Sequence, residues 1–226
     1  MTILFISGID TNIGKSVACG ALANSLIQQG LNTCTQKWIE TGCENESQDL
    51  LTHQSMVESQ INQHDISLHA PYCFKFPASP HLAASLEKQK IEASYLLQQT
   101  QQLSEKCDHL LIEGAGGLCV PIDANILLID LLAQMQLPVL LVTSGRLGSI
   151  NQTLLSLALC EQRKVEVRAI IYNQYPTEDA TIVADTREWL QNYLRQKNLS
   201  ILWLELEQQA TSIAINQEQL QLLLAD

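Results

Sequence analysis

The stretch Gly8-Ile9-Asp10-Thr11-Asn12-Ile13-Gly14-Lys15-Ser16 decides the fold, and we call it the phosphate loop. An apolar run, Ile3 to Ile6, precedes it and predicts a buried parallel strand. After it, apolar residues at helical spacing continue until Gly30. A strand, a glycine-bearing turn and a helix that opens with Gly-Lys-Ser form the context of a nucleotide-phosphate site. We therefore predict that this loop binds a polyphosphate.

The residues of the loop suit that chemistry. Gly14 lets the backbone approach a phosphate, and the first N–H groups of the following helix point at it. Lys15 adds a positive charge on the outer phosphates, and Ser16 offers a hydroxyl to Mg²⁺. The glycines Gly8 and Gly14 are separated by five residues, one more than in the common pattern. The alternative interpretation is an ordinary strand–helix turn with a surface lysine.

Composition limits the possible classes of protein. The chain has 226 residues, of which 46% are hydrophobic and 16% charged, and this predicts one domain over residues 1–226. The net charge of −11 argues against nucleic-acid binding, whereas the local loop decides whether ATP binds. No apolar run is long enough to span a membrane, and no signal peptide precedes the first strand. The scattered cysteines predict reduced thiols in a cytoplasmic protein.

Strands and helices alternate along the chain. Apolar runs predict further strands at residues 31–38, 72–76, 109–112, 138–142, 165–172 and 201–204. Helical patterns lie between them, at residues 47–59, from residue 79, and at 92–106, 125–135, 149–160 and 178–197, with an amphipathic helix in the tail beyond residue 210. We take Ser47 and Ser79 as N-caps, and Ser149 to Gln152 as a capping box. A polar loop is expected at residues 40–42. The glycines at 114–117 either form only a tight turn or permit close approach to a ligand.

This alternation predicts an α/β fold, in which a parallel β-sheet is covered by helices on both faces, as in the phosphate-loop NTPases. Ligands of such sheets bind beyond the carboxyl ends of the strands. The candidate polar residues all follow predicted strand ends: Lys15, Lys37, Thr41, Glu113, Gly148 and Asn173. We therefore expect one site at that edge of the sheet.

Five segments carry a resemblance to a known family. They are the phosphate loop with its five-residue spacing, Lys37 with Thr41-Gly42, Ser79-Pro80-His81, Glu113 to Gly117, and Gly148 to Asn151. Together, over about residues 2 to 205, they resemble the dethiobiotin synthetase family. The set is far more specific than any one of its members.

The resemblance implies an ATP- and Mg²⁺-dependent carboxylation of 7,8-diaminononanoate in biotin synthesis. One amine takes up CO₂, supplied as CO₂ or bicarbonate, and forms a carbamate. ATP converts the carbamate to a carbamic–phosphoric anhydride, and the second amine then closes the ring. The products are dethiobiotin, ADP and phosphate. The resemblance also implies a homodimer that binds the diamine across the subunit interface.

The roles of individual residues follow from the resemblance and from residue chemistry. Because the carbamate, its anhydride and the transferring phosphoryl group are anionic, clustered cations and short donors suit the reaction. The predicted catalytic residues are Lys37, Lys15 and Thr11. The predicted Mg²⁺ ligands are Ser16, Asp49 and Glu113. The predicted ATP contacts are Asn12, Ile13, Gly14, Lys15, Ser16, Val17, Glu113, Gly116, Asn173, Leu202, Trp203 and Leu204. The predicted substrate contacts are Thr41, Ser79, Pro80, Gly148, Ser149, Ile150 and Asn151.

Each of these roles has a structural alternative. Lys37 could be an exposed lysine at a strand end, and Asp49 could merely complement a helix dipole. Glu113 ends an apolar strand, where an unpaired buried carboxylate would be costly. The segment from Gly148 to Asn151 is first of all a helix start, although its free N–H groups could hold a carboxylate.

The chain also departs from the family pattern. Trp38 stands where the family usually has proline, Asn12 where glutamate is frequent, and Leu202 where a proline borders the adenine. A divergent synthetase with another amine substrate therefore remains an alternative. A second alternative is a phosphate-loop switch ATPase that acts on a protein partner. Such ATPases carry a second lysine close after the first glycine, where this chain has Ile9.

Overall fold

The computed structural model describes residues 1–44, 46–57, 65–175 and 179–225. Within them the chain forms a six-stranded sheet in the order β2-β5-β1-β6-β7-β8, and all of its pairings are parallel. The strands of this sheet are β1 (Thr2–Gly8), β2 (Thr33–Lys37), β5 (His109–Gly117), β6 (Val139–Ser144), β7 (Val167–Asn173) and β8 (Leu202–Leu206). The α/β fold predicted from the alternating patterns is confirmed.

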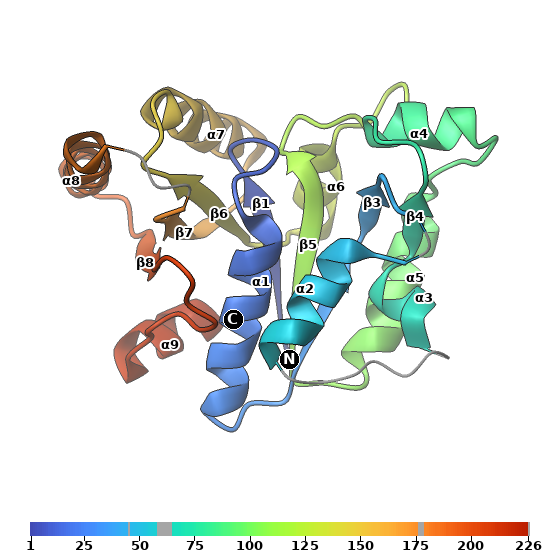
Figure 1. Ribbon diagram of the computed structural model, residues 1–226, viewed down its shortest axis with the longest axis horizontal. Coiled ribbons are helices and arrows are strands. Elements are labelled where there is room, and N and C mark those ends of the chain that lie inside the picture. The colour runs from blue at the N-terminus through green and yellow to red at the C-terminus, as the bar shows by residue number, and fades with distance from the viewer. Residues whose placement is uncertain (45, 58–64, 176–178, 226) are drawn as a thin grey trace.

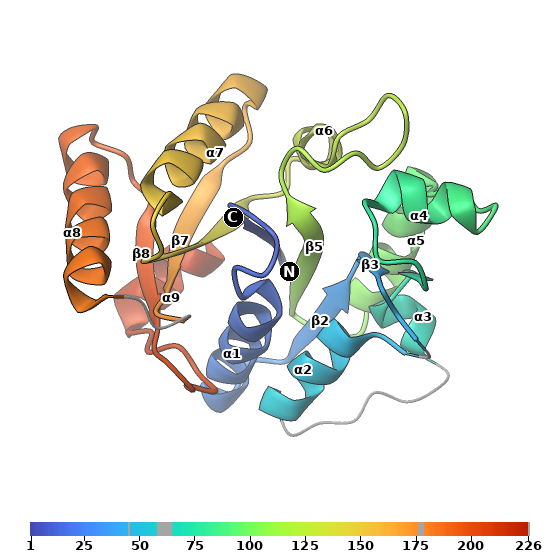
Figure 2. The same ribbon diagram turned by 45° about the horizontal axis from the view of Figure 1, so that its top comes forward.

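Helices cover both faces of the sheet. They are α1 (Lys15–Gln28), α2 (Gln48–Val57), α3 (Ile66–His69), α4 (Pro80–Leu86), α5 (Ala93–Ser104), α6 (Leu128–Met135), α7 (Ser149–Arg163), α8 (Ala180–Gln196) and α9 (Gln217–Leu224). In Figure 1, α1 and α2 lie in front of the sheet, and α6 and α7 lie behind it. Figure 2 turns the carboxyl ends of the strands forward and shows the phosphate loop between α7 and α8 on one side and α4 on the other.

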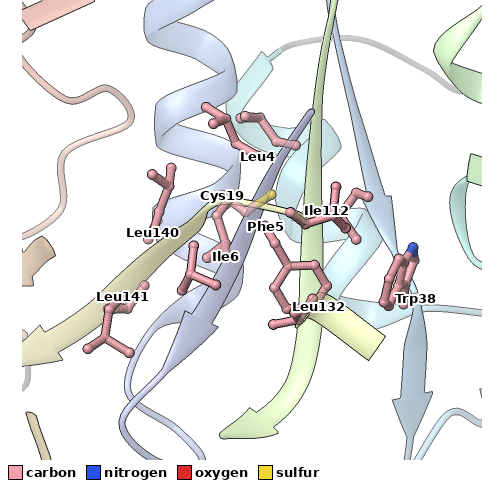
Figure 3. Packing of buried hydrophobic residues seen from close by; sticks show 14 of the residues in the cluster. Leu4, Phe5, Ile6, Cys19, Trp38, Ile112, Leu132, Leu140 and Leu141 are labelled. Atoms are coloured by element: carbon pink, nitrogen blue, oxygen red, sulfur yellow. The ribbon is translucent and has the colours of Figure 1, made fainter. Parts of the chain in front are cut away.

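Strand β1 is apolar on both faces because both faces are covered. Leu4, Phe5 and Ile6 are at most 1% exposed. Figure 3 shows these side chains packed among those of β5, β6, α1 and α6. A continuous apolar run, instead of an alternating one, is the pattern that such a doubly covered strand requires.

Two expected turns are strands instead. The predicted polar loop at residues 40–42 is wrong in part, because Ile39–Thr41 forms strand β3 and pairs in parallel with β4 (Tyr72–Phe74). The tight turn considered for the glycines at residues 114–117 is also wrong, because β5 continues through Gly117, which lies opposite Gly8 of β1. A Cβ at Gly114 would stand 2.7 Å from Cζ of Phe5. That glycine therefore serves close packing within the sheet and not a turn.

Two helix starts also differ from the prediction. Helix α6 begins at Leu128 and not at Asn125, because Asp123 accepts the N–H groups of Asn125 and Ile126 and folds them into a turn. Helix α7 has Gly148 as its N-cap, with φ of 92°, and the capping box predicted at Ser149 is absent. The Ser149 hydroxyl instead lies 3.3 Å from the Ser144 hydroxyl. Sequence spacing alone could not reveal that partner.

The remaining boundaries agree to within a few residues, and the short helix α3 was not predicted. The predicted helix ends near residues 59 and 178 lie outside the described residues. No helix in the described part of the chain is long and apolar enough to cross a membrane.

The tail forms the expected amphipathic helix, α9, which is attached to the body of the fold. Asn216 and Gln219 form its capping box, and Leu223 is fully buried. Arg168 of β7 donates to the carbonyl oxygens of Leu223 and Ala225. The tail is therefore part of the structural core.

Candidate active site

A cavity of about 680 Å³ lies at the carboxyl edge of the sheet. It is lined by Thr11, Asn12, Gly14, Lys15, Ser16, Val17, Lys37, Ile39, Glu40, Thr41, Asp49, Thr52, Glu113, Ala115, Gly116, Asn173, Tyr175, Glu207 and Gln209. The ends of β1, β2, β5 and β7 therefore bring together residues that are far apart in the sequence. This convergence is what a parallel sheet predicts at its carboxyl edge.

The phosphate loop runs from the end of β1 to the start of α1 and is fixed by Asn173. The Asn173 amide donates to the carbonyl oxygen of Ile13 at 2.9 Å. Gly14 has φ of 92°, and a Cβ there would stand 2.2 Å from Asn173 Nδ2. No side chain caps α1 at Gly14, so the first N–H groups of the helix have no side-chain acceptor. This is the arrangement in which a helix N-terminus binds an anion.

A buried charge cluster stands beside the loop. Lys37 Nζ lies 2.6 Å from Asp49 Oδ2 and 2.7 Å from Glu113 Oε1, and it also donates to the carbonyl oxygen of Gly114. The Ser16 hydroxyl lies 2.6 Å from Asp49 Oδ1 and 3.0 Å from Glu113 Oε1. Lys37 is therefore not an exposed strand-end lysine, and Glu113 is not an unpaired carboxylate.

The cluster shifts the pKa values of its members. Burial would raise the pKa of Glu113, but Lys37 and His53 outweigh it and lower that pKa to about 2. Burial likewise opposes the charge of Lys37, yet Glu113 and Asp49 raise its pKa above the ordinary value. Among the described residues, no carboxylate lies at salt-bridge distance from Lys15. Burial, with the nearby charge of Lys37, lowers the pKa of Lys15 to about 8. Lys15 is thus a buried cation whose charge an anionic ligand would stabilise.

The donor set of the cluster fits Mg²⁺. The hydroxyl of Ser16 lies within hydrogen-bonding distance of both carboxylates, those of Asp49 and Glu113. Hard oxygen ligands of this kind, with positions left for waters and phosphate oxygens, are what Mg²⁺ prefers. Asp49 lies in the first turn of α2, so a contribution to the helix dipole is compatible with this role.

His53 is a member of the cluster that the sequence analysis missed. It is fully buried, and its Nε2 lies 2.9 Å from Glu113 Oε2. An ionised carboxylate only accepts hydrogen bonds, so Nε2 must carry the proton. The only available signal was spacing, because His53 follows Asp49 by four residues and therefore lies on the same face of α2.

Glu40 of β3 fixes the start of α2. Its Oε1 accepts the N–H of Gln48 at 3.0 Å and the N–H of Asp49 at 3.3 Å, and its Oε2 accepts the Ser47 hydroxyl. The Ser47 oxygen in turn accepts the N–H of Leu50, so the predicted N-cap is confirmed. Glu40 thereby positions the helix that carries Asp49 and His53.

On the remaining side of the cavity, the structure differs from the expected adenine contacts. The predicted residues Leu202 to Leu204 lie in β8 and do not line the cavity. Tyr175, Glu207 and Gln209 line it instead. These residues follow the ends of β7 and β8, and the general rule for strand ends could have identified them.

Trp38, which departs from the family pattern, belongs to the core and not to the cavity. It is 1% exposed, and its Nε1 donates to Gln36 and Thr100. Its ring meets the ring of Phe5 edge-on at 5.0 Å. This departure therefore changes packing beneath the site and not the lining of the cavity.

The predicted substrate contacts are not all in one place. Thr41 lines the first cavity, whereas Ser79 and Pro80, at the start of α4, line neither this cavity nor the second one, described next. Gly148, Ile150 and Asn151 line a second cavity of about 730 Å³, together with residues of α8. Within one chain, therefore, the two groups of predicted substrate contacts are separated.

The α7 start nevertheless touches the phosphate loop. Arg146 Nη2 lies 2.5 Å from Asp10 Oδ2, and Gln152 Nε2 lies 3.2 Å from the same oxygen. The Arg146 bond is the main reason that the pKa of Asp10 is lowered. Asp10 thus joins the loop to the segment that contains Gly148 to Asn151.

Comparisons with known proteins agree with this geometry. A family described as an AAA domain matches residues 2–209. An ATP-dependent dethiobiotin synthetase BioD 2 of Haemophilus ducreyi is 46% identical over 86% of this chain and 92% of its own length. A protein of the same description from Pasteurella multocida is 46% identical over 89% of this chain and 95% of its own. A ParA family ATPase from Chlorobium tepidum TLS has a TM-score of 0.53 at 15% identity, covers 99% of this chain and 89% of its own, and shows the fold alone.

Proposed function

Because this chain belongs to the ATP-dependent dethiobiotin synthetase family, we propose that its cavity converts 7,8-diaminononanoate and CO₂, with ATP, to dethiobiotin, ADP and phosphate. It is a ligase of biotin biosynthesis that uses ATP as its co-substrate. We further propose Mg²⁺ as its metal ion, a cytoplasmic location and a homodimer.

The observation that carries the proposed mechanism is the cluster of Lys37, Asp49, Glu113 and Ser16 beside an uncapped phosphate loop. Backbone N–H groups and Lys15 hold the triphosphate, so its terminal group is directed into the cavity. Ser16, Asp49 and Glu113 would hold Mg²⁺, which would supply positive charge beside the phosphate oxygens.

Lys37 serves the carbamate. Its ammonium is buried and charged, and Lys37 lines the same cavity as the phosphate loop and Thr41. A fixed cation in a site that excludes water stabilises negative charge that develops as the phosphoryl group moves to the carbamate oxygen. The hydroxyls of Thr11 and Thr41 line the same cavity and donate to the anionic groups on either side.

The adenine side follows from the strand ends of β7 and β8. Asn173 lies at the edge of the loop, and Tyr175 offers a half-exposed ring to the cavity. We propose that the base lies against these residues, with Gln209 as a polar partner, and that the chain backbone at 202–204 supports that surface.

The deciding experiment is an assay of the purified protein with ATP, Mg²⁺, bicarbonate and 7,8-diaminononanoate. Mass spectrometry should detect dethiobiotin in amounts equal to the ADP released. Release of ADP without a cyclic urea would contradict the proposal and would point to another amine or to a switch ATPase. Omission of the diamine serves as the control for uncoupled hydrolysis.

A further inference from the structure

Two cysteines and a carboxylate lie close together at strands β3 and β4, outside the charge cluster. Glu40 of β3 lies opposite Cys73 of β4, and the N–H of Cys43 donates to the carbonyl oxygen of Phe74 at 2.9 Å. The ligand atoms of Glu40, Cys43 and Cys73 all lie within 4.8 Å of one another. Glu40 and Cys43 are buried, whereas Cys73 is exposed. Pairing of the two short strands therefore creates this group, which no spacing in the sequence announces.

From this geometry we propose that Cys43, Cys73 and Glu40 bind a thiophilic divalent cation of the Zn²⁺ class. Thiolate sulfurs bind Zn²⁺ at about 2.3 Å and carboxylate oxygens at about 2.0–2.2 Å, and a tetrahedral ion then holds its ligand atoms about 3.5–3.8 Å apart. The three atoms therefore need to approach by only about 1 Å. Exposure of Cys73 leaves the fourth position open to water.

The group offers two thiols and one carboxylate as ligand atoms. Burial, followed by the proximity of Cys73 and Glu40, raises the pKa of Cys43, and burial also raises the pKa of Cys73. Both thiols are therefore protonated at neutral pH when no cation is bound. Lys37, whose charge also acts on Cys73, is already held by Asp49 and Glu113. A divalent ion would displace the two thiol protons to solvent, and the two thiolates and one carboxylate would hold it.

A disulfide between Cys43 and Cys73 is a different outcome, and the structure favours it less. It would require an external two-electron oxidant, which a divalent cation does not need. The carboxylate of Glu40 would also have no part in it. The experiment below separates the two outcomes.

The test is metal titration of the folded chain, purified with a reductant and freed of metal by a chelator. Excess Mg²⁺ occupies the acidic cluster at Asp49 and Glu113, which prefers hard cations. Cd²⁺ should then give the ultraviolet charge-transfer band of thiolate ligands at one equivalent. Zn²⁺ should compete for that site, and its affinity is measured against a chromophoric chelator.

The variants Cys43→Ser and Cys73→Ser should each remove the band and weaken Zn²⁺ binding by about 100-fold or more. Loss of an outer-shell partner costs up to about 100-fold in affinity, and loss of a direct ligand should cost at least as much. The matched controls are Cys34→Ser and Cys107→Ser, because these two thiols also interact with each other but, among the described residues, do not belong to a group of ligands that could hold a metal ion. The controls should keep both the band and the affinity. Thermal melting checks that each variant folds, and Cys73→Ala at the exposed position replaces Cys43→Ser if the latter does not.

Three results would overturn the proposal. The first is unchanged Zn²⁺ affinity in the Cys43 or Cys73 variants. The second is loss of the band in the control variants alone. The third is a protein that binds no metal and has lost two hydrogens through a Cys43–Cys73 disulfide. None of these results bears on whether the cavity forms dethiobiotin, because the titration measures no turnover.

Discussion

At the scale of single residues, the charge cluster shows how burial and pairing set chemical roles. Lys37 and Glu113 are each costly to bury alone, but together they are both ionised in the core. Lys15 has no carboxylate at salt-bridge distance in the part of the chain that the structure describes, so it is available for a phosphate. The two lysines therefore differ: Lys37 is held by carboxylates of the protein, whereas Lys15 is available to an anionic ligand.

Lys37→Ala should lower the rate of dethiobiotin formation by about 100-fold or more, the scale of losing one preorganised charge-stabilising donor. The measurement is kcat/KM for the diamine. The matched control is Lys90→Ala, whose side chain is 71% exposed and forms a surface ion pair, and which should keep the wild-type rate. Near-normal turnover of Lys37→Ala would remove Lys37 from the mechanism.

Nucleotide affinity should fall as the pH rises through about 8, because the pKa of Lys15 is lowered to about 8. Below that pH Lys15 is charged and attracts phosphate; above it, the neutral amine must take up a proton before it binds. Calorimetry with Mg²⁺–ADP at about pH 7 and about pH 9 measures the change, which for one group cannot exceed tenfold per pH unit, about 1.4 kcal/mol. An affinity that does not change across this interval would contradict the role of Lys15.

His53 should act as a positioning residue for Glu113. His53→Leu removes the hydrogen bond to Glu113 Oε2, and we expect the Mg²⁺ concentration for half activity to rise about tenfold or more, the usual cost of losing an outer-shell partner. His53→Gln places an amide N–H near the position of Nε2 and should restore part of the affinity. Mn²⁺ binding to the protein without ATP gives a second readout. Equal behaviour of the Leu and Gln variants would leave His53 with a packing role only.

At the scale of elements, the phosphate loop and the start of α2 are positioned by contacts from other strands. Asn173 of β7 holds the loop, and Glu40 of β3 holds the helix that carries Asp49. Each of these two elements could be predicted from its own sequence, because glycine marks the phosphate loop and serine marks the start of α2. The hydrogen bond that orients the loop comes from a segment more than a hundred residues away, and those that orient α2 come from strand β3.

Gly14→Ala should abolish detectable nucleotide binding, because the new Cβ would collide with Asn173 Nδ2. Gly30→Ala is the matched control. Gly30 also has a positive φ, of 82°, but nothing lies within 4 Å of its Cβ position. In both variants an alanine adopts a positive φ, which costs about 1–2 kcal/mol. Urea unfolding should therefore show similar losses of stability from this strain in the two variants. Only Gly14→Ala should lose ADP binding. Retained binding in Gly14→Ala would show that the loop relaxes around the methyl group.

At the scale of the whole molecule, one chain separates residues that the proposed reaction needs together. Thr41 lines the first cavity, whereas Gly148, Ile150 and Asn151 line the second. The second cavity is rimmed by apolar side chains, among them Leu147, which is 85% exposed, and Trp189, which is 42% exposed. A second copy of the chain packed on this face would cover that surface and bring its own α7 start toward the first cavity.

Light scattering should therefore give a mass of twice the 25.1 kDa of one chain. Leu147→Asp should weaken the dimer and raise the KM for the diamine more than that for ATP. Leu222→Asp, at a position of 56% exposure on α9, is the control and should remain dimeric. A wild-type protein that is monomeric at assay concentration and fully active would contradict the shared site.

The sequence by itself determined the α/β fold, the phosphate loop and most members of the charge cluster. Local rules were enough, because apolar runs mark doubly covered strands and Gly-Lys-Ser after a first strand has one common use. Only the tertiary structure decided the pairing of β3 with β4, the extension of β5 through Gly117, the place of His53 and the meeting of Cys43 with Cys73. These features depend on contacts between segments distant in sequence, and neither helical nor strand periodicity carries information about such contacts.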